Sequence, residues 1–540
     1  MELSMKTIPC IIKRCYSCVC RHLKSKLFLV LILFPLICGY LKSEDSAVQQ
    51  DVPMSQSSPP ASVACIPPWE TLQAVIVSIP LESMLESPKL LDLYTNIAAV
   101  VTKYCDLLVC YSFEERGSLP TLMDHFQSDE RVRQNTYRID YVEAETSSLW
   151  IRDYGPVFGK NSDGTYTIFQ NRYEIKKSKI DALEKKDPRM LDDYEKELLN
   201  QHRMKQVARE EDSRTNAHLA QMLGYLYGME ASIKKTGLLI EGGDFMYAGN
   251  ERLITSETGF LDDDVEKSEF TGRLKTTYGV NHVYYLPNLP GNAATHLDMN
   301  MMILDEGHIL LNEVPQRNKE KRIYMDYLYS LIEKQLSYSQ KYLKKQLPDM
   351  KILMLPSLPI IADSRKTIVN KLWNRVFDRA GAEIGIEWVN VLQWNKDHKQ
   401  RIAAEKMIKD EIIRKVGPVD FWEEEGLGRT LRYYFGTTLE REDWIHSERL
   451  TFYRSYTNCL FIKSPSGEEA ILLPRYPAMN PDEEKMIAEF EPRVEAAYHE
   501  ARPDATIYWL DVEPLIGLQG VIHCLTSTVP YDPDQVSHNE

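Results

Sequence analysis

Short apolar runs that alternate with a helical pattern constrain the fold of this chain most. Residues 74–80 (AVIVSIP) and 107–112 (LLVCYS) have the length and apolar character of buried strands, and residues 90–102 between them have amphipathic helical spacing. The pattern begins near Cys65, and strand signals return as far as the C-terminal end. This strand–helix–strand rhythm predicts an α/β architecture.

Further strand-like segments follow the first three elements. They are residues 138–142, 150–158, 237–256 (two runs), 283–286, 299–304, 308–311, 457–463, 470–474, 506–510 and 520–526. Two segments at about 174–224 and 315–450 break the rhythm, because they are rich in charged residues with spaced Leu and Met. We interpret both as helical insertions with solvated faces on a compact core. A lid or a partner-docking subdomain is the alternative.

The N-terminal residues predict export rather than part of the fold. Six Lys and Arg residues between positions 6 and 26 precede the apolar run LFLVLILFPLIC at 27–38, and a polar, Pro- and Ser-rich stretch follows. We expect a secreted or extracytoplasmic protein, with membrane anchoring through the uncleaved apolar run as the second reading. The expected organisation is a signal peptide or membrane anchor at 1–40, a linker at 41–64, a catalytic domain at 65–533 and a tail at 534–540.

Charge and cysteine usage exclude some classes of function. The net charge of −15 disfavours binding to the nucleic-acid backbone, which relies on Lys and Arg to neutralise phosphates. It is compatible with a cationic substrate. Five of the ten cysteines follow the leader, and their spacing does not resemble a zinc site. An odd number leaves at least one thiol without an intramolecular partner.

Five short segments place polar or titratable residues at a strand end or a glycine-rich turn. They are residues 147–158 (SSLWIRDYGPVF), 240–244 (IEGGD), 295–300 (THLDMN), 453–459 (YRSYTNC) and 517–530 (GLQGVIHCLTSTVP). His296 and Asp298 are two residues apart, so an extended strand would point both to one face. By the same rule we expect His523 to point away from Cys524 as a structural residue. Together these segments predict a convergent site.

In this order, the segments WIRDYGP, IEGGD, THLD and GVIHC resemble the guanidino-group-modifying enzymes, and within them the agmatine deiminase and bacterial-type peptidylarginine deiminase branch. Trp69-Glu70 and the YTN segment at 456–458 also fit this branch. The resemblance covers about residues 65–173, 205–312 and 451–533. It implies a pentein fold, which is a five-fold pseudosymmetric α/β propeller with the site at its centre, here with helical insertions.

The resemblance also implies roles for individual residues. Cys524 matches the nucleophile, His296 the general acid and base, and Asp153 and Asp298 the carboxylates that bind the guanidinium group. Glu241 matches a carboxylate that orients the histidine or the substrate. The candidate substrate-binding residues are Asp153, Asp298, Asn458, Trp150 and Arg172. No metal or other cofactor is required, because carboxylates match a guanidinium in charge and in paired N–H bonds, and the cysteine supplies the nucleophile.

The implied reaction is cysteine-dependent hydrolysis of a guanidinium to a ureido group and ammonia through a covalent thiouronium. Arginine in peptides or proteins is the favoured substrate, while agmatine and free arginine stay open. The arginines that bind a substrate carboxylate are expected after the first strand, where an insertion disturbs the pattern and leaves Arg172 and Arg209 as candidates. Two alternatives are a Cys-His acyl-transfer enzyme, which has no use for paired carboxylates, and a non-catalytic scaffold, which has no reason to keep the four reacting residues.

Overall fold

The computed structural model describes residues within a single compact unit, Ser62–Glu540. The described residues are 63–173, 184–185, 193–262, 265–289, 296–317, 323–362, 451–515 and 520–533. None of the helices in these ranges is both long enough and apolar enough to cross a membrane. The expected leader at 1–40, nearly all of the linker, the tail and residues 363–450 of the second charged segment lie outside the described residues.

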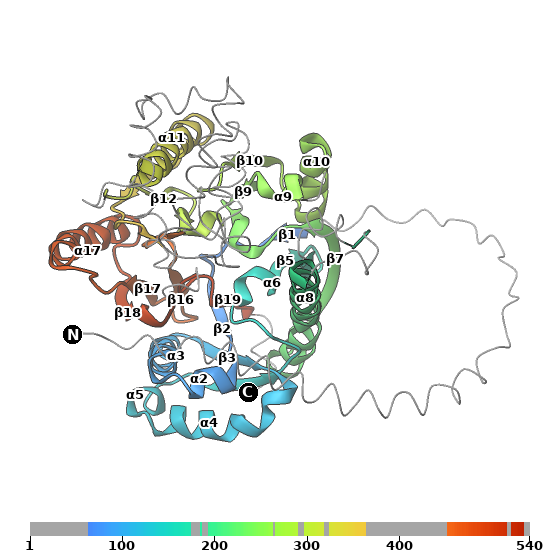
Figure 1. The fold of residues 1–540 in the computed structure, drawn as a ribbon. Helices are drawn as coiled ribbons and strands as arrows, with labels where there is room; N and C mark the ends of the chain where they lie inside the picture. The colour runs from blue at the N-terminus through green and yellow to red at the C-terminus, as the bar shows by residue number, and fades with distance from the viewer. Residues whose placement is uncertain are drawn as a thin grey trace, which may run out of the picture. The chain divides into compact units, whose positions relative to one another are not determined.

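Five sheets in the described ranges share one pattern (Figure 1). In each, a first strand pairs antiparallel with a second, and the second pairs parallel with a third that is reached through a helical crossover. In the order first, second and third strand, unit 1 contains β19 (Thr526–Pro530), β2 (Leu72–Ser78) and β3 (Asp106–Tyr111), and unit 2 contains β5 (Val157–Asn161), β6 (Tyr166–Arg172) and β7 (Ala231–Leu239). Unit 3 contains β8 (Phe245–Tyr247), β9 (Arg252–Ser256) and β10 (His282–Leu286), and unit 4 contains β11 (Met301–Ile303), β12 (His308–Asn312) and β13 (Lys351–Leu355). Unit 5 contains β16 (Leu460–Lys463), β17 (Glu469–Arg475) and β18 (Thr506–Asp511).

Each second strand is joined to its third strand by helix, as a parallel pair requires. The crossover helices are α2 (Leu81–Leu85) with α3 (Pro88–Val101), α8 (Asp193–Tyr227), α9 (Thr258–Asp262) with α10 (Lys267–Tyr278), α11 (Ile323–Gln346) and α17 (Pro481–Ala501). The remaining elements are the strands β1 (Val63–Cys65), β4 (Ile139–Glu143), β14 (Ile361–Ala362) and β15 (Thr451–Phe452), the helices α4 (Leu119–Ser128), α5 (Glu130–Arg133) and α6 (Ile151–Tyr154), and the 3₁₀ turns η1 (Phe113–Ser118), η4 (Gly242–Asp244), η5 (Leu297–Met299) and η7 (Glu513–Leu515).

Local sequence explains where the crossover helices begin and end. Helix α3 starts at Pro88, whose missing N–H costs nothing in the first turn, and buries an apolar stripe along its length. Helix α17 is capped by Asn480, whose side chain accepts hydrogen bonds from two backbone N–H groups of the first turn. Helix α10 ends at Gly279, which takes the left-handed conformation that glycine adopts without steric cost. These signals place the helices between the strands of each unit.

Helix α8 occupies the second half of the charged segment 174–224. Its C-terminal half packs against the second unit, where Leu219, Leu223 and Tyr227 are buried with residues of β6. In α11, Ile332 and Leu336 are buried in the main apolar cluster in the same way. One face of each helix therefore packs into the core of its unit, while residues such as Met204 and Val207 of α8 are exposed.

Two expectations about the segments that precede β5 and β11 are wrong. Residues 151–154 form a helical turn instead of part of a strand, because the Gly155 N–H closes the turn onto the Ile151 carbonyl at 2.7 Å. A Cβ on Gly155 would lie 2.3 Å from that oxygen, so the turn needs glycine. His296 is extended but Asp298 lies in η5, so the two do not share a strand face. Both differences arise where the chain turns before a first strand.

Candidate active site

The five polar segments occupy one equivalent position in the fold. Each lies immediately before the first strand of a unit: Asp153 before β5, Glu241 before β8, His296 before β11, Asn458 before β16 and Cys524 before β19. Equivalent loops of repeated units meet at one end, so these residues come together although they span most of the chain. The structure thus explains why five separate segments carry the polar residues.

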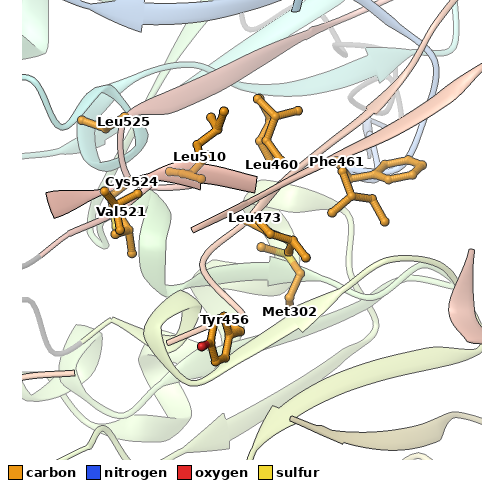
Figure 2. Packing of buried hydrophobic residues seen from close by; sticks show 14 of the residues in the cluster. Met302, Tyr456, Leu460, Phe461, Leu473, Leu510, Val521, Cys524 and Leu525 are labelled. Carbon is orange, nitrogen blue, oxygen red and sulfur yellow. The ribbon is translucent and has the colours of Figure 1, made fainter. Parts of the chain in front are cut away.

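Cys524 lies in the turn before β19, 3% exposed, within the main apolar cluster. Figure 2 shows it beside Val521 of the same turn. The Asn458 amide donates to its Sγ at 3.1 Å, and the thiol lies 3.4 Å from Asp298 Oδ2. Burial, followed by the charge of nearby carboxylates, raises the thiol pKa well above its ordinary value. The thiol is therefore neutral until a cation offsets those charges.

Asn458 positions the turn that carries Cys524. Besides donating to the sulfur, its Oδ1 accepts hydrogen bonds from the backbone N–H groups of His523 at 2.9 Å and Cys524 at 3.4 Å. Asn458 itself is fully buried. One amide side chain therefore fixes both the backbone and the sulfur of the turn.

His523 does not point away from the site, and the sequence expectation is wrong. Its Nδ1 lies 2.8 Å from Asp298 Oδ2, the same oxygen that faces Cys524. The alternation of a strand does not apply, because residues 522–525 form a turn. Burial, with the positive charge of Arg152, lowers the His523 pKa to about 4. The ring is therefore neutral at physiological pH and donates to Asp298 through Nδ1–H.

His296 lies between two carboxylates. Its Nε2 is 2.6 Å from Glu241 Oε2, and its Nδ1 is 3.4 Å from Asp153 Oδ1. Burial disfavours the charged ring, but Asp153 and Glu241 outweigh this and raise the pKa well above 6.5. His296 is therefore an imidazolium at neutral pH and can donate a proton. Gly243 leaves room for the ring, since a Cβ there would lie 2.5 Å from His296 Nδ1.

Glu241 links His296 to Arg209, which the sequence suggested as a candidate for binding a substrate carboxylate. Arg209, on α8, donates through Nη1 to Glu241 Oε1 at 2.7 Å, and its guanidinium lies 4.2 Å from the centre of the Tyr173 ring. Burial would raise the Glu241 pKa, but Arg209 and His296 together lower it. Arg172, the other arginine suggested by the sequence, is exposed at the end of β6, opposite Leu239.

Asp153 and Asp298 each provide an oxygen atom without a hydrogen bond in the described ranges, and Asp153 Oδ1 has only the ion pair with His296 at 3.4 Å. Both of these Oδ1 atoms are buried. Burial raises the pKa of Asp153. For Asp298, burial is opposed by the hydrogen bond and charge of His523 together with the charge of His296 and the Cys524 contact, and the net effect lowers its pKa. Buried polar atoms are normally hydrogen-bonded, so these oxygens suit a ligand rich in N–H donors.

Aromatic and backbone contacts fix the edges of the site. The half-buried Trp150 ring packs so closely on Gly520 that a Cβ there would lie 2.4 Å from a ring carbon. Asp244 accepts a hydrogen bond from the Leu297 backbone at 3.0 Å, joining the Glu241 segment to the His296 segment. Burial raises the Asp244 pKa to about 7. The sequence pattern held no signal for these tertiary contacts.

Among the described residues, one group of side chains has the spacing of metal ligands, and it consists of Asp153, Glu241 and His296. One ligand atom from each lies within 4.8 Å of the others. The two carboxylates, however, face different nitrogens of the same imidazole ring. One cation cannot accept both nitrogens of a single ring, so the group is a poor tetrahedral cage. The two carboxylates instead hold the His296 ring in place and favour its protonated form.

Comparisons with known proteins bear on the family and on the fold. A family model described as Porphyromonas-type peptidyl-arginine deiminase matches residues 65–530. No curated protein matches the sequence significantly. Three similar solved structures are an agmatine deiminase from C. jejuni (14% identity, 87% of this chain and 96% of that chain, TM-score 0.50), a proposed arginine deiminase from Porphyromonas gingivalis (14%, 87% and 98%, 0.51) and an agmatine deiminase from Enterococcus faecalis (13%, 87% and 96%, 0.50). The expected pentein α/β fold is thereby confirmed.

Proposed function

This chain belongs to the Porphyromonas-type peptidyl-arginine deiminase family, and from that premise we propose that it hydrolyses the guanidinium group of arginine in peptides or proteins. The products are a citrulline residue and ammonia. The observation that carries the proposal is the pair of buried oxygens on Asp153 and Asp298, beside the thiol of Cys524 and the imidazolium of His296. A planar cation with several N–H groups satisfies both carboxylates at once.

Substrate binding activates the nucleophile. A guanidinium between Asp153 and Asp298 neutralises the charges that hold the Cys524 thiol protonated, and so lowers its pKa. The thiol proton passes to solvent, and the Asn458 N–H stabilises the thiolate that results. Attack on the guanidinium carbon forms a carbon–sulfur bond and a tetrahedral adduct. Two buried carboxylates beside the carbon favour this cation over a neutral acyl group.

His296 then moves the protons. The imidazolium donates one proton to the departing nitrogen, which leaves as ammonia, and the product is a covalent thiouronium. The neutral ring next takes a proton from water. The water oxygen adds to the carbon, the carbon–sulfur bond breaks to restore the thiolate, and the proton left on that oxygen passes to solvent as the ureido product is released. Glu241 holds the ring through both steps at 2.6 Å.

The deiminase reaction is tested by measuring citrulline and ammonia from the full chain under reducing conditions. Arginine within a peptide, free arginine and agmatine are supplied in parallel. Cys524→Ala should abolish turnover, while Cys110→Ala, which removes a buried thiol from β3, should not. Preference for the peptide supports the substrate assignment, and preference for agmatine keeps the chemistry but replaces the substrate. Absence of turnover on all three refutes the proposal.

We further propose that the protein acts outside the cytoplasm. The basic leader and the apolar run at 27–38 support export, and uncleaved retention of that run would provide a membrane tether. Expression of the full chain in a secreting host, followed by N-terminal sequencing of the exported protein, tests this. A mature N-terminus near residue 40 supports cleavage, whereas retention of the whole chain in the cytosol refutes export.

A further inference from the structure

Helix α8 is held at the site by a row of polar contacts along one face. Asp212 accepts hydrogen bonds from the backbone N–H groups of Ser147 at 2.7 Å and Ser148 at 3.2 Å, and Asn216 donates to the Tyr154 carbonyl at 3.0 Å. Both residues are about 1% exposed. The helix is therefore fixed in register against the loop that precedes Asp153.

Arg209 lies on the same face of α8, three residues before Asp212 and seven before Asn216. Its guanidinium is held from two sides, by Glu241 Oε1 at 2.7 Å and by the Tyr173 ring at 4.2 Å. The side chain is 29% exposed, so the contact with Glu241 is only partly screened by solvent. A rigid helix thus presents one cation to the carboxylate that holds His296.

Glu241 divides its two oxygens between these partners. Oε1 accepts from Arg209 and Oε2 faces His296 Nε2 at 2.6 Å. Without the arginine, the carboxylate would keep His296 as its one anchor instead of two. A carboxylate that can rotate no longer fixes the plane of the imidazole.

We propose that Arg209 is a positioning residue, which fixes Glu241 so that Glu241 holds His296 in line with the reacting nitrogen. The inference rests on the proposed deiminase reaction. It also assigns Arg209 a role other than binding a carboxylate of the substrate. Such a carboxylate would have to displace Glu241 from a contact at 2.7 Å.

The kinetic test compares Arg209→Ala with Arg214→Ala. Arg214 is a matched control, because it lies on the same helix and pairs with Glu145 in an exposed contact away from the site. Loss of an orienting partner typically costs about 10- to 100-fold, so Arg209→Ala should lower kcat by that factor with KM changed less than about threefold. Arg214→Ala should stay within about twofold of wild type. A raised KM with unchanged kcat would instead mean that Arg209 binds substrate.

Two further variants separate positioning from general structure. Arg209→Lys keeps the positive charge but lacks the planar guanidinium group, so its kcat should lie between those of Arg209→Ala and wild type. This variant also replaces Arg209→Ala in the test if the alanine variant does not fold. If Arg209 acts through Glu241, the double variant Arg209→Ala/Glu241→Gln should be no slower than Glu241→Gln alone by more than about twofold. Fully additive losses would overturn the inference.

A readout without turnover keeps the inference distinct from the proposed function. The short contact between His296 Nε2 and Glu241 predicts a strongly downfield imidazole N–H proton in the NMR spectrum, assigned by its loss in His296→Ala. Arg209→Ala should lose or shift this proton, and Arg214→Ala should keep it. An unchanged proton in Arg209→Ala refutes positioning. If Arg209→Ala loses this proton but the wild-type enzyme turns over no guanidino substrate, the proposed function is refuted and the positioning of His296 by Arg209 stands.

Discussion

Gly243 offers a direct test of how tightly the site holds His296. Its backbone lies outside the left-handed region, so Gly243→Ala introduces no conformational strain and adds a single methyl group. That methyl carbon would lie 2.5 Å from His296 Nδ1 and 2.7 Å from Cγ, whereas ordinary contact begins near 3.4 Å. The ring or the loop must therefore move by about 0.9 Å.

The size of the effect follows from this displacement. A shift of about 1 Å in a catalytic group costs on the order of 100-fold in rate, or about 3 kcal/mol in the activation free energy. The hydrogen bond of 2.6 Å from His296 to Glu241 would be strained by the same movement. Overpacking should also lower the free energy of unfolding by about 1–3 kcal/mol. We expect a folded protein with kcat/KM reduced about 100-fold.

The assay combines steady-state kinetics on the best guanidino substrate with urea unfolding. Gly272→Ala, on α10, is the neutral control because nothing lies within 4 Å of its added Cβ. Gly259→Ala is the opposite control, since its Cβ would lie 2.7 Å from the Phe270 ring and should cost stability without affecting kcat. Activity of Gly243→Ala within threefold of wild type, at equal folded fraction, would refute the reasoning.

Three other predictions concern the surroundings of the site. The His523 pKa of about 4 lies below its ordinary 6.5, so the unfolded chain binds this proton first as pH falls, and about 3 kcal/mol of stability should be lost between pH 7 and pH 4. His523→Gln should remove that part of the pH dependence of urea unfolding. Asn458→Ala should lower kcat about 10- to 100-fold in steady-state assays, because it deletes a hydrogen bond to the charged Cys524 sulfur; an unchanged kcat would argue against this contact. Glu483→Ala should cost about 3–5 kcal/mol in urea unfolding, because the buried Arg454 would keep its hydrogen bonds to the Pro359 carbonyl but lose its only carboxylate partner among the described residues, at 2.7 Å; a loss below 1 kcal/mol would contradict that role.

The order and chemistry of the site segments could be predicted from the sequence. Cys524, His296 and the two aspartates stand in short polar segments next to strand-like runs, and those local patterns depend on a few neighbouring residues. The strands at β2 and β3 and helix α3 were predictable for the same reason. The five-fold repeat was not visible in the sequence, because the units share strand pairing and crossover helices rather than residue identities.

Only the tertiary structure decided how the site residues are charged and held. His523 faces Asp298 across 225 positions of chain, and Arg209 reaches Glu241 across 32. Neither contact follows from alternation or helical spacing, since both depend on where separate units place their loops. The pKa directions of Cys524 and His296 also come from burial and from charges on other units. The sequence by itself therefore determined which groups are present, and the packing of the five units determined which of them act together, because electrostatic coupling depends on distance in space.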